Sequence, residues 1–187
     1  MQKLTDFIRY YLPNEDLEEL LASFSEIKYV RRNDIFLRPP QSSGFIAFVE
    51  KGLFRVYFCD DAGKEITTWF SFEDMVITDL LSFYTGQKAF FYVQALEDCE
   101  VRLISKKRLD ELYDKRPDYR EFGRKFAEEA LVITMQRLLT FYSKGAEEHY
   151  LELLSQPELL QRVPLKHLAT YIGITDSSLS RIRKNLT

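Results

Sequence analysis

The chain has 187 residues, of which 45% are hydrophobic and 29% charged, and its formal net charge is −3. Such a length and composition fit one large or two small globular domains and exclude collagen-like and linker-rich chains. No apolar run reaches the roughly eighteen residues of a membrane span, and the N-terminus lacks the layout of a secretory signal. Two cysteines are too few for a disulfide framework or a four-cysteine metal site. We therefore expect a cytoplasmic protein with no membrane partner and no bound metal.

The first hundred residues change from a helical period to a strand period. Leu17, Leu20, Leu21 and Phe24 have helical spacing, and Asn14 is the expected N-cap of their helix. Strands are then expected at 29–36, 45–49, 53–59, 65–70, 92–96 and 100–105. The segment 60–63 ends in Gly63, which predicts a hairpin turn with a positive φ at that glycine. Several short strands at regular spacing predict an antiparallel barrel or jelly roll.

The next segment is helical. A short helix at 107–114 stops near Pro117, and a long helix runs from Asp118 to about Lys144. Its apolar stripe contains Phe122, Phe126, Ala130, Ile133 and Leu138. This helix is more apolar than one buried face requires, which favours pairing with the same helix of a second subunit. The alternative is that it packs only on its own barrel.

The C-terminal segment differs from the rest in charge and in pattern. Residues 162–187 carry a net charge of +4, and residues 1–161 carry −7. A short helix with Leu165, Leu168 and Ala169 inside is followed by Gly173, where a tight turn needs positive φ. Thr175 is the expected N-cap of a second helix, whose inner residues are Leu179 and Ile182. This order predicts a helix-turn-helix.

The outer face of the second helix suits DNA. Short polar side chains at a helix start can approach base edges in the major groove, and arginine can bond guanine with two hydrogen bonds. The predicted base-reading residues are Asp176, Ser177, Ser178 and Arg181, and the predicted phosphate contacts are Lys166, Thr175, Arg183 and Lys184. The basic skew of this segment supports the same interpretation.

Blocks along nearly the whole chain resemble the Crp/Fnr family of bacterial transcription regulators, the family of the catabolite activator protein. These blocks are Phe48-Val49-Glu50-Lys51-Gly52, Asp60-Asp61-Ala62-Gly63-Lys64-Glu65, Ala95-Leu96-Glu97-Asp98-Cys99-Glu100-Val101, Ile104-Ser105, Arg116-Pro117-Asp118, Ile172-Gly173-Ile174-Thr175 and Leu179-Ser180-Arg181-Ile182. The resemblance implies an α+β protein. Its expected parts are a cyclic-nucleotide-binding-like β-roll (a jelly roll) at 1–116, a dimerisation helix at 117–145 and a helix-turn-helix domain at 146–187.

The resemblance also implies partners. They are a second copy of the chain, a palindromic double-stranded DNA operator and, as a further candidate, RNA polymerase. Many relatives continue into a β-hairpin wing after the recognition helix, whereas this sequence has no clear wing after Thr187. DNA affinity is then expected to rest on the helix pair and on dimerisation.

One departure from the family concerns the effector. In the family, a cassette with Gly-Glu near its start and Arg-Ser or Arg-Thr near its end holds the ribose and the cyclic phosphate. Here Asp79 falls at the Glu position and Ala89-Phe90 at the Arg-Ser pair, with Lys88 one residue away. Burying the cyclic phosphate in the pocket without a cation beside it costs roughly several kcal/mol of binding free energy. We therefore expect no cofactor and no tight binding of cyclic AMP.

The effector pocket is expected to involve Asp79, Leu80, Phe83, Lys88, Ala89 and Phe90. The aromatic residues Phe83, Tyr84, Phe90, Phe91 and Tyr92 can fill the volume left by the nucleotide. Two alternatives stay open here: a closed pocket without ligand, and a pocket for another, more apolar effector.

Two other function classes compete with a DNA-binding regulator. An enzyme on a β-barrel, such as a cupin dioxygenase, needs several histidines around a metal, and residues 1–148 contain none, so we expect no enzyme and no catalytic residues. The other alternative is a ligand-binding or protein-interaction module with a degenerate effector pocket that has lost DNA binding. A salt-dependent shift of a DNA probe separates it from a regulator.

Overall fold

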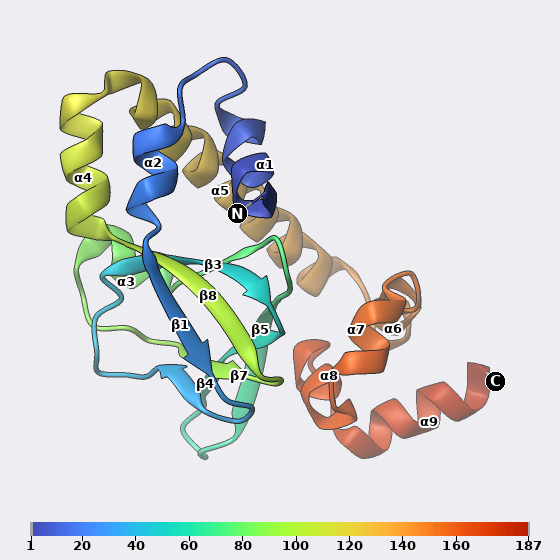
Figure 1. Cartoon of the computed structure of the whole chain (residues 1–187). Helices are drawn as coiled ribbons and strands as arrows, with labels where there is room; N and C mark the ends of the chain where they lie inside the picture. Colours follow the sequence, from blue (N-terminus) through green and yellow to red (C-terminus); the bar gives the residue numbers. More distant parts are fainter. Residues whose placement is uncertain (1, 187) are drawn as a thin grey trace. The chain divides into compact units, whose positions relative to one another are not determined.

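The computed structural model describes residues 2–186. Their elements, in chain order, are α1 (Gln2–Tyr11), α2 (Glu18–Ser23), β1 (Glu26–Val30), β2 (Ile35–Leu37), β3 (Phe45–Lys51), β4 (Phe54–Cys59), β5 (Glu65–Ser71), β6 (Val76–Ile77), α3 (Leu80–Thr85), β7 (Tyr92–Ala95), β8 (Cys99–Ser105), α4 (Lys106–Lys115), α5 (Pro117–Ser143), α6 (Ala146–Leu154), α7 (Pro157–Arg162), α8 (Leu165–Tyr171) and α9 (Asp176–Leu186). Figure 1 shows these elements. Antiparallel sheets followed by a long helix and short C-terminal helices confirm the predicted α+β fold.

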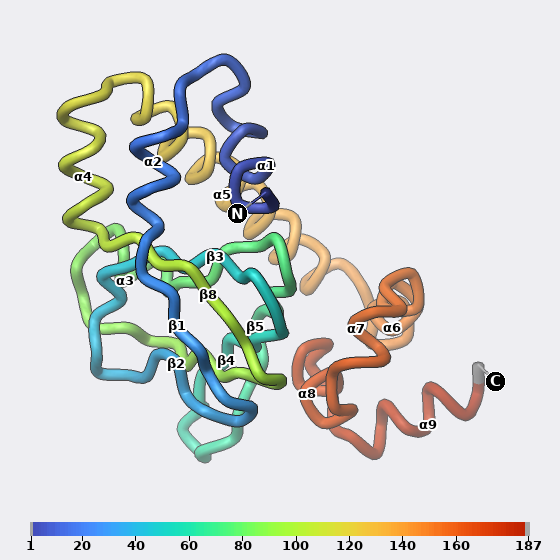
Figure 2. The backbone as a smooth tube through the Cα atoms, viewed as in Figure 1, coloured from blue at the N-terminus to red at the C-terminus, as the bar shows by residue number. Residues whose placement is uncertain are grey.

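The strands form two four-stranded sheets, with the orders β1-β8-β3-β6 and β2-β7-β4-β5. β1 pairs antiparallel with β8, so that Val30 lies opposite Cys99 although they are far apart in sequence. Figure 2 shows these two strands running side by side. The pairing of β3 with β8 places Ile46 opposite Ile104. Strand order that departs from chain order is the result of the jelly-roll topology.

The turn between β4 and β5 is the hairpin that the sequence predicts. Gly63 has a φ of +77°. The Asp60 carboxylate accepts hydrogen bonds from the backbone N–H groups of Ala62 and Lys64 at 3.0 and 2.9 Å. A carboxylate that bonds its own following backbone fixes such a turn locally.

The chain consists of two compact units. Of the described residues, unit 1 contains 2–56 and 70–130, and unit 2 contains 57–69 and 131–186. The hairpin tip of β4 and β5 therefore belongs with the C-terminal helices, and the division passes through α5 between Ala130 and Leu131. The predicted boundaries at 116/117 and 145/146 follow the elements along the chain instead.

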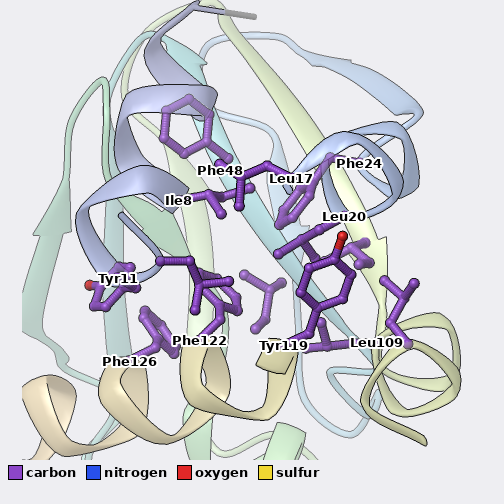
Figure 3. Packing of buried hydrophobic residues seen from close by; sticks show 14 of the residues in the cluster. Ile8, Tyr11, Leu17, Leu20, Phe24, Phe48, Leu109, Tyr119, Phe122 and Phe126 are labelled. Carbon is purple, nitrogen blue, oxygen red and sulfur yellow. The ribbon is translucent and has the colours of Figure 1, made fainter. Parts of the chain in front are cut away.

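Unit 1 has one apolar core, where α1, α2, α4 and the first half of α5 gather at one end of the sheets (Figure 1). Figure 3 shows its side chains, among them Ile8, Leu20, Phe48 and Tyr119. Tyr11 contacts Phe122 edge-on, with ring centroids 5.5 Å apart, and its hydroxyl donates a hydrogen bond to Glu129 at 2.5 Å. α1 is thereby fastened along the first half of α5.

This core corrects part of the predicted dimer stripe. Phe122 is 1% exposed and Phe126 7%, and both pack against Tyr11 of the same chain. They are therefore core residues and are not available to a second subunit. Ile133 and Leu138, from the same predicted stripe, are exposed, and Ala130 is half-buried.

Two local expectations in unit 1 also need correction. Asn14 does not cap a helix; α2 begins at Glu18, whose N–H donates to the Asp16 carboxylate at 3.0 Å. The predicted strand at 29–36 is two strands, β1 and β2, with Asn33 at a φ of +73° between them. The polar run 31–34 is the turn that separates them.

Candidate functional site

The helices α8 and α9 of unit 2 form the predicted helix-turn-helix. Gly173 has a φ of +78°, the left-handed conformation that the turn requires. The N–H of Ile174 donates to the Ala169 carbonyl at 2.9 Å, which closes the C-terminal end of α8. Leu168 and Ala169 on α8 and Leu179 on α9 are buried. Three of the five predicted inner side chains are therefore buried, whereas Leu165 and Ile182 are half-buried.

Thr175 caps α9, as predicted. Its hydroxyl oxygen accepts a hydrogen bond from the N–H of Ser178 at 3.2 Å. The hydroxyl oxygens of Ser177 and Ser178 lie 3.0 and 2.9 Å from that of Thr175. Ser178 is half-buried, so its hydroxyl belongs to the cap network at the helix start. Its predicted contact with a base would need that network to open.

The exposed face of α9 is polar and basic. At 100° per residue, Ser177, Ser180, Arg181 and Lys184 share one face, and Leu179 points the other way. All four are exposed, and so is Lys166 on α8. Ser180 was missed as a candidate contact, although its spacing of three residues from Ser177 was visible in the sequence. Asp176 is exposed in the first turn of the helix, where its negative charge interacts favourably with the positive end of the helix dipole.

Arg183 lies on the side of α9 that faces other helices of unit 2. Its side chain helps to line a cavity of about 260 Å³, together with Tyr150, Leu160, Val163, Leu165 and Leu168. Arg183 itself is exposed, so its guanidinium has access to solvent. Its contact with phosphate stays a prediction, as do those of Lys166, Thr175 and Lys184.

In unit 1, the candidate effector cassette is organised around a buried carboxylate. Asp79 is 2% exposed and caps α3, with Oδ1 accepting the N–H of Ser82 at 2.9 Å. Its Oδ2 accepts the N–H groups of Phe90 and Phe91 at 3.0 and 3.2 Å. Three charge-assisted hydrogen bonds satisfy this carboxylate inside the protein. Asp79 therefore ties the start of α3 to the loop that precedes β7.

Further hydrogen bonds hold the same loop. Ser82 donates its hydroxyl to the Gln87 carbonyl at 2.5 Å, and the N–H of Ser43 donates to the Ser82 hydroxyl at 2.8 Å. The N–H of Ala89 donates to the Gln41 carbonyl at 2.7 Å. The cassette is thus bonded to itself and to the loop before β3.

The structure separates the predicted pocket residues. Asp79 and Ala89 are buried at the loop, and Phe83 belongs to the unit 1 core, against which Leu80 packs. Lys88 is exposed, and Phe90 is 56% exposed. Tyr84 is also exposed, so the expectation that the whole aromatic run fills the nucleotide's volume is wrong for Tyr84 and Phe90. Alternation along the loop turns Ala89 inward and its neighbours outward.

Two observations limit other kinds of site within residues 2–186. That part of the chain holds no group of three or more His, Cys, Asp and Glu side chains that could bind a metal ion. None of its helices combines the length and the apolarity needed to cross a membrane.

Comparisons with known proteins agree with this architecture. The family model of the cyclic nucleotide-binding domain matches residues 27–116. No curated protein matches the chain. Among solved structures, FixK2 from Bradyrhizobium japonicum is 19% identical, with a TM-score of 0.71 over 86% of this chain and 83% of that one. A putative Crp/Fnr-family transcriptional regulator from Eubacterium rectale is 13% identical, with a TM-score of 0.71 over 94% and 85%.

A third similar structure is the catabolite activator protein of Thermus thermophilus, 16% identical, with a TM-score of 0.56 over 92% of this chain and 84% of that one. At such identities the likeness establishes the fold. Residues 27–116 match the family model of the cyclic nucleotide-binding domain, and the chain shares its fold with these three solved structures.

Proposed function

We propose that this chain is a homodimeric, sequence-specific DNA-binding regulator of transcription that does not respond to cyclic AMP. The observation that carries the proposal is the surface of α9. Its exposed face presents Ser177, Arg181 and Lys184, while Leu179 on the opposite face is buried against α8. A helix held by its apolar face, with a short polar start and basic residues beyond, has the composition of a recognition helix.

Dimerisation is supported by the second half of α5. Leu131, Val132, Met135, Leu139 and Tyr142 are exposed, with exposed fractions between 47% and 79%. So many large apolar side chains within three turns exceed what a monomer leaves in water. A second copy related by a two-fold axis offers the same apolar residues, and it gives a palindromic operator its symmetry.

The lack of response to cyclic AMP is supported by the cassette. Ala89 and Phe90 supply no cation to a cyclic phosphate, and the Asp79 carboxylate already accepts the N–H groups of Phe90 and Phe91. A phosphate placed at these N–H groups would lie beside a carboxylate and would be repelled. The chain is therefore expected to bind its operator without this nucleotide.

The test of DNA binding uses two substitutions on the helix pair. Arg181→Ala should cost about 1–3 kcal/mol on the preferred site and relax the preference at one position of each half-site. Lys166→Ala should weaken binding to all duplexes alike and reduce the slope of log affinity against log salt. Fluorescence anisotropy with labelled duplexes at several salt concentrations measures both effects.

If the wild-type protein shows no salt-dependent binding to any duplex, DNA binding is lost and the chain is a ligand-binding or protein-interaction module. If Arg181→Ala and Lys166→Ala change binding to all sequences in the same way, the assignment of base and phosphate contacts is wrong.

A further inference from the structure

The C-terminal end of α8 is held by a residue from the hairpin of the β-roll. The hydroxyl oxygen of Thr170 accepts the backbone N–H of Thr67 on β5 at 3.3 Å and lies 3.0 Å from the Thr67 hydroxyl oxygen. Thr67 is 2% exposed, so water does not replace these bonds. The Thr170 hydroxyl has a single hydrogen, which it can donate to Thr67 or to the His167 carbonyl at 3.2 Å.

The same end of α8 is held by a residue of α5. The Nη2 of Arg137 donates to the Tyr171 carbonyl at 2.6 Å, and its guanidinium lies over the Tyr171 ring, 3.6 Å from the centroid. The last carbonyls of a helix have no partner within it, and a cation near them is favourable. Arg137 therefore caps α8 from outside the helix-turn-helix.

A third contact fixes the turn. The Phe141 ring of α5 lies so close to Gly173 that a Cβ at that position would be 3.3 Å from the ring. Thr170, Tyr171 and Gly173 are thus each in contact with a different side chain that lies outside the predicted DNA-binding segment. All these residues belong to unit 2.

These contacts set the orientation of α9, because α8 and α9 are joined tightly. The N–H groups of Gly173 and Ile174 donate to the carbonyls of Thr170 and Ala169 at 3.2 and 2.9 Å. Leu179 of α9 is completely buried. A rotation of α8 about its anchors must therefore carry α9 with it.

We infer that Thr67 and Arg137 are positioning residues of the DNA-binding helices. Thr67 acts through Thr170 and Arg137 acts through Tyr171, and together they fix the direction in which α9 presents Arg181. β4 and β5 also belong to the sheet that contains β7, the strand that follows the effector cassette. Within unit 2, Thr67 of β5 is therefore joined to α8 through a hydrogen-bonded contact. The inference rests on the proposed DNA binding and adds to it the residues that orient the recognition helix.

The experiment compares Thr170→Val and Arg137→Gln with the wild-type full-length chain. Val keeps the shape of Thr and removes the hydroxyl, and Thr170→Ser restores it. The first measurement is amide hydrogen exchange of the Thr67 N–H without DNA. The second is anisotropy with a selected palindromic duplex and with a random duplex. Matched controls are Thr5→Val on α1 and Arg124→Gln on the first half of α5, and thermal unfolding checks that each variant is folded.

We expect Thr170→Val to speed exchange of the Thr67 amide at least tenfold and Thr170→Ser to leave it within about twofold. Thr170→Val and Arg137→Gln should each weaken binding to the palindrome at least threefold and leave binding to random duplex unchanged. A variant that is partly unfolded would instead bind both duplexes more weakly. The ratio of the two affinities is therefore the readout that a purely structural role does not move.

The two ways of failing are distinct. An unchanged exchange rate of the Thr67 amide in Thr170→Val contradicts the contact and overturns the inference, whatever happens on DNA. Faster exchange with an unchanged affinity ratio overturns the positioning role while DNA binding stands. A wild-type chain that binds neither duplex refutes the proposed function, and the positioning role with it.

Discussion

The carboxylate of Asp79 accepts a hydrogen bond at 3.0 Å from the backbone N–H of Phe90, eleven residues further along the chain. This hydrogen bond joins the start of α3 to the loop before β7, and its acceptor is a negatively charged side chain of the protein itself. In a cyclic-nucleotide-binding domain, a ligand phosphate would bring negative charge to this loop. Here that charge is already part of the chain.

Loss of this carboxylate should destabilise unit 1. Asp79→Ala leaves the N–H groups of Ser82, Phe90 and Phe91 without their acceptor. We expect the free energy of unfolding to fall by about 2–3 kcal/mol, measured by urea denaturation.

Wild-type protein titrated calorimetrically with cyclic AMP should show no micromolar binding. A micromolar or tighter Kd would contradict the role assigned to Asp79.

A methyl group at the turn of the helix pair should cost more than the same group at the β4–β5 turn. Gly173 and Gly63 have φ values of +78° and +77°, so Ala is equally strained at both positions. Only at 173 does the added Cβ meet a ring, that of Phe141 at 3.3 Å, because nothing lies within 4 Å at 63. Gly173→Ala should be less stable than Gly63→Ala by about 1 kcal/mol in thermal unfolding. Equal losses would show that the Phe141 contact is not tight.

The two cysteines should differ in reactivity. Cys99 is buried, and burial raises the pKa of its thiol to about 11, whereas Cys59 is exposed. Thiolate is the reactive form, so iodoacetamide near pH 8 should label Cys59 and spare Cys99 until the protein unfolds. Mass spectrometry of the native protein distinguishes the two sites.

The same pKa shift gives a pH dependence of stability. The folded-state pKa of Cys99 lies above the ordinary value of 9.0, so the folded state favours the protonated thiol. Its contribution to stability is fully present below pH 9 and is lost as the pH rises through about 11. Cys99→Ser should flatten this part of the stability curve, and an unchanged slope would contradict the shift.

A charge on the second half of α5 should separate the dimer. Leu139 is 68% exposed and lies among other exposed apolar residues. Burying the Leu139 side chain in the interface contributes about 1.5–3 kcal/mol to association. Leu139→Lys removes this contribution and would bury an ammonium group in each copy, so it should weaken self-association at least tenfold. Sedimentation equilibrium measures this, with Lys107→Glu on α4 as a control at an exposed position. A variant that remains as dimeric as the wild type would place the interface elsewhere.

The helix-turn-helix could be predicted because its signals are local. Gly173 must have positive φ, Thr175 must cap, and Leu179 must be buried, and each requirement can be read within a few residues. The β4–β5 turn, with Gly63, is the same kind of local case. These segments were predicted correctly because backbone chemistry, which does not depend on distant packing, decides them.

The misjudged residues depend on distant partners. Phe122 and Phe126 have the spacing of a dimer stripe, yet α1 covers them, and the sequence does not show that Tyr11 reaches them. Asp79 was identified as a cassette residue by resemblance. Its hydrogen bonds to Phe90 and Phe91 could not be predicted, because they involve backbone N–H groups, which nearly every residue has. Thr67 and Thr170, 103 residues apart, carried no signal at all.

The most direct test is selection from a library of random duplexes by the purified wild-type protein, without cyclic AMP, followed by sequencing of the retained DNA. The account predicts enrichment of a palindrome whose half-sites are about one helical turn apart, or a multiple of it. A folded, dimeric protein that enriches no sequence would contradict it.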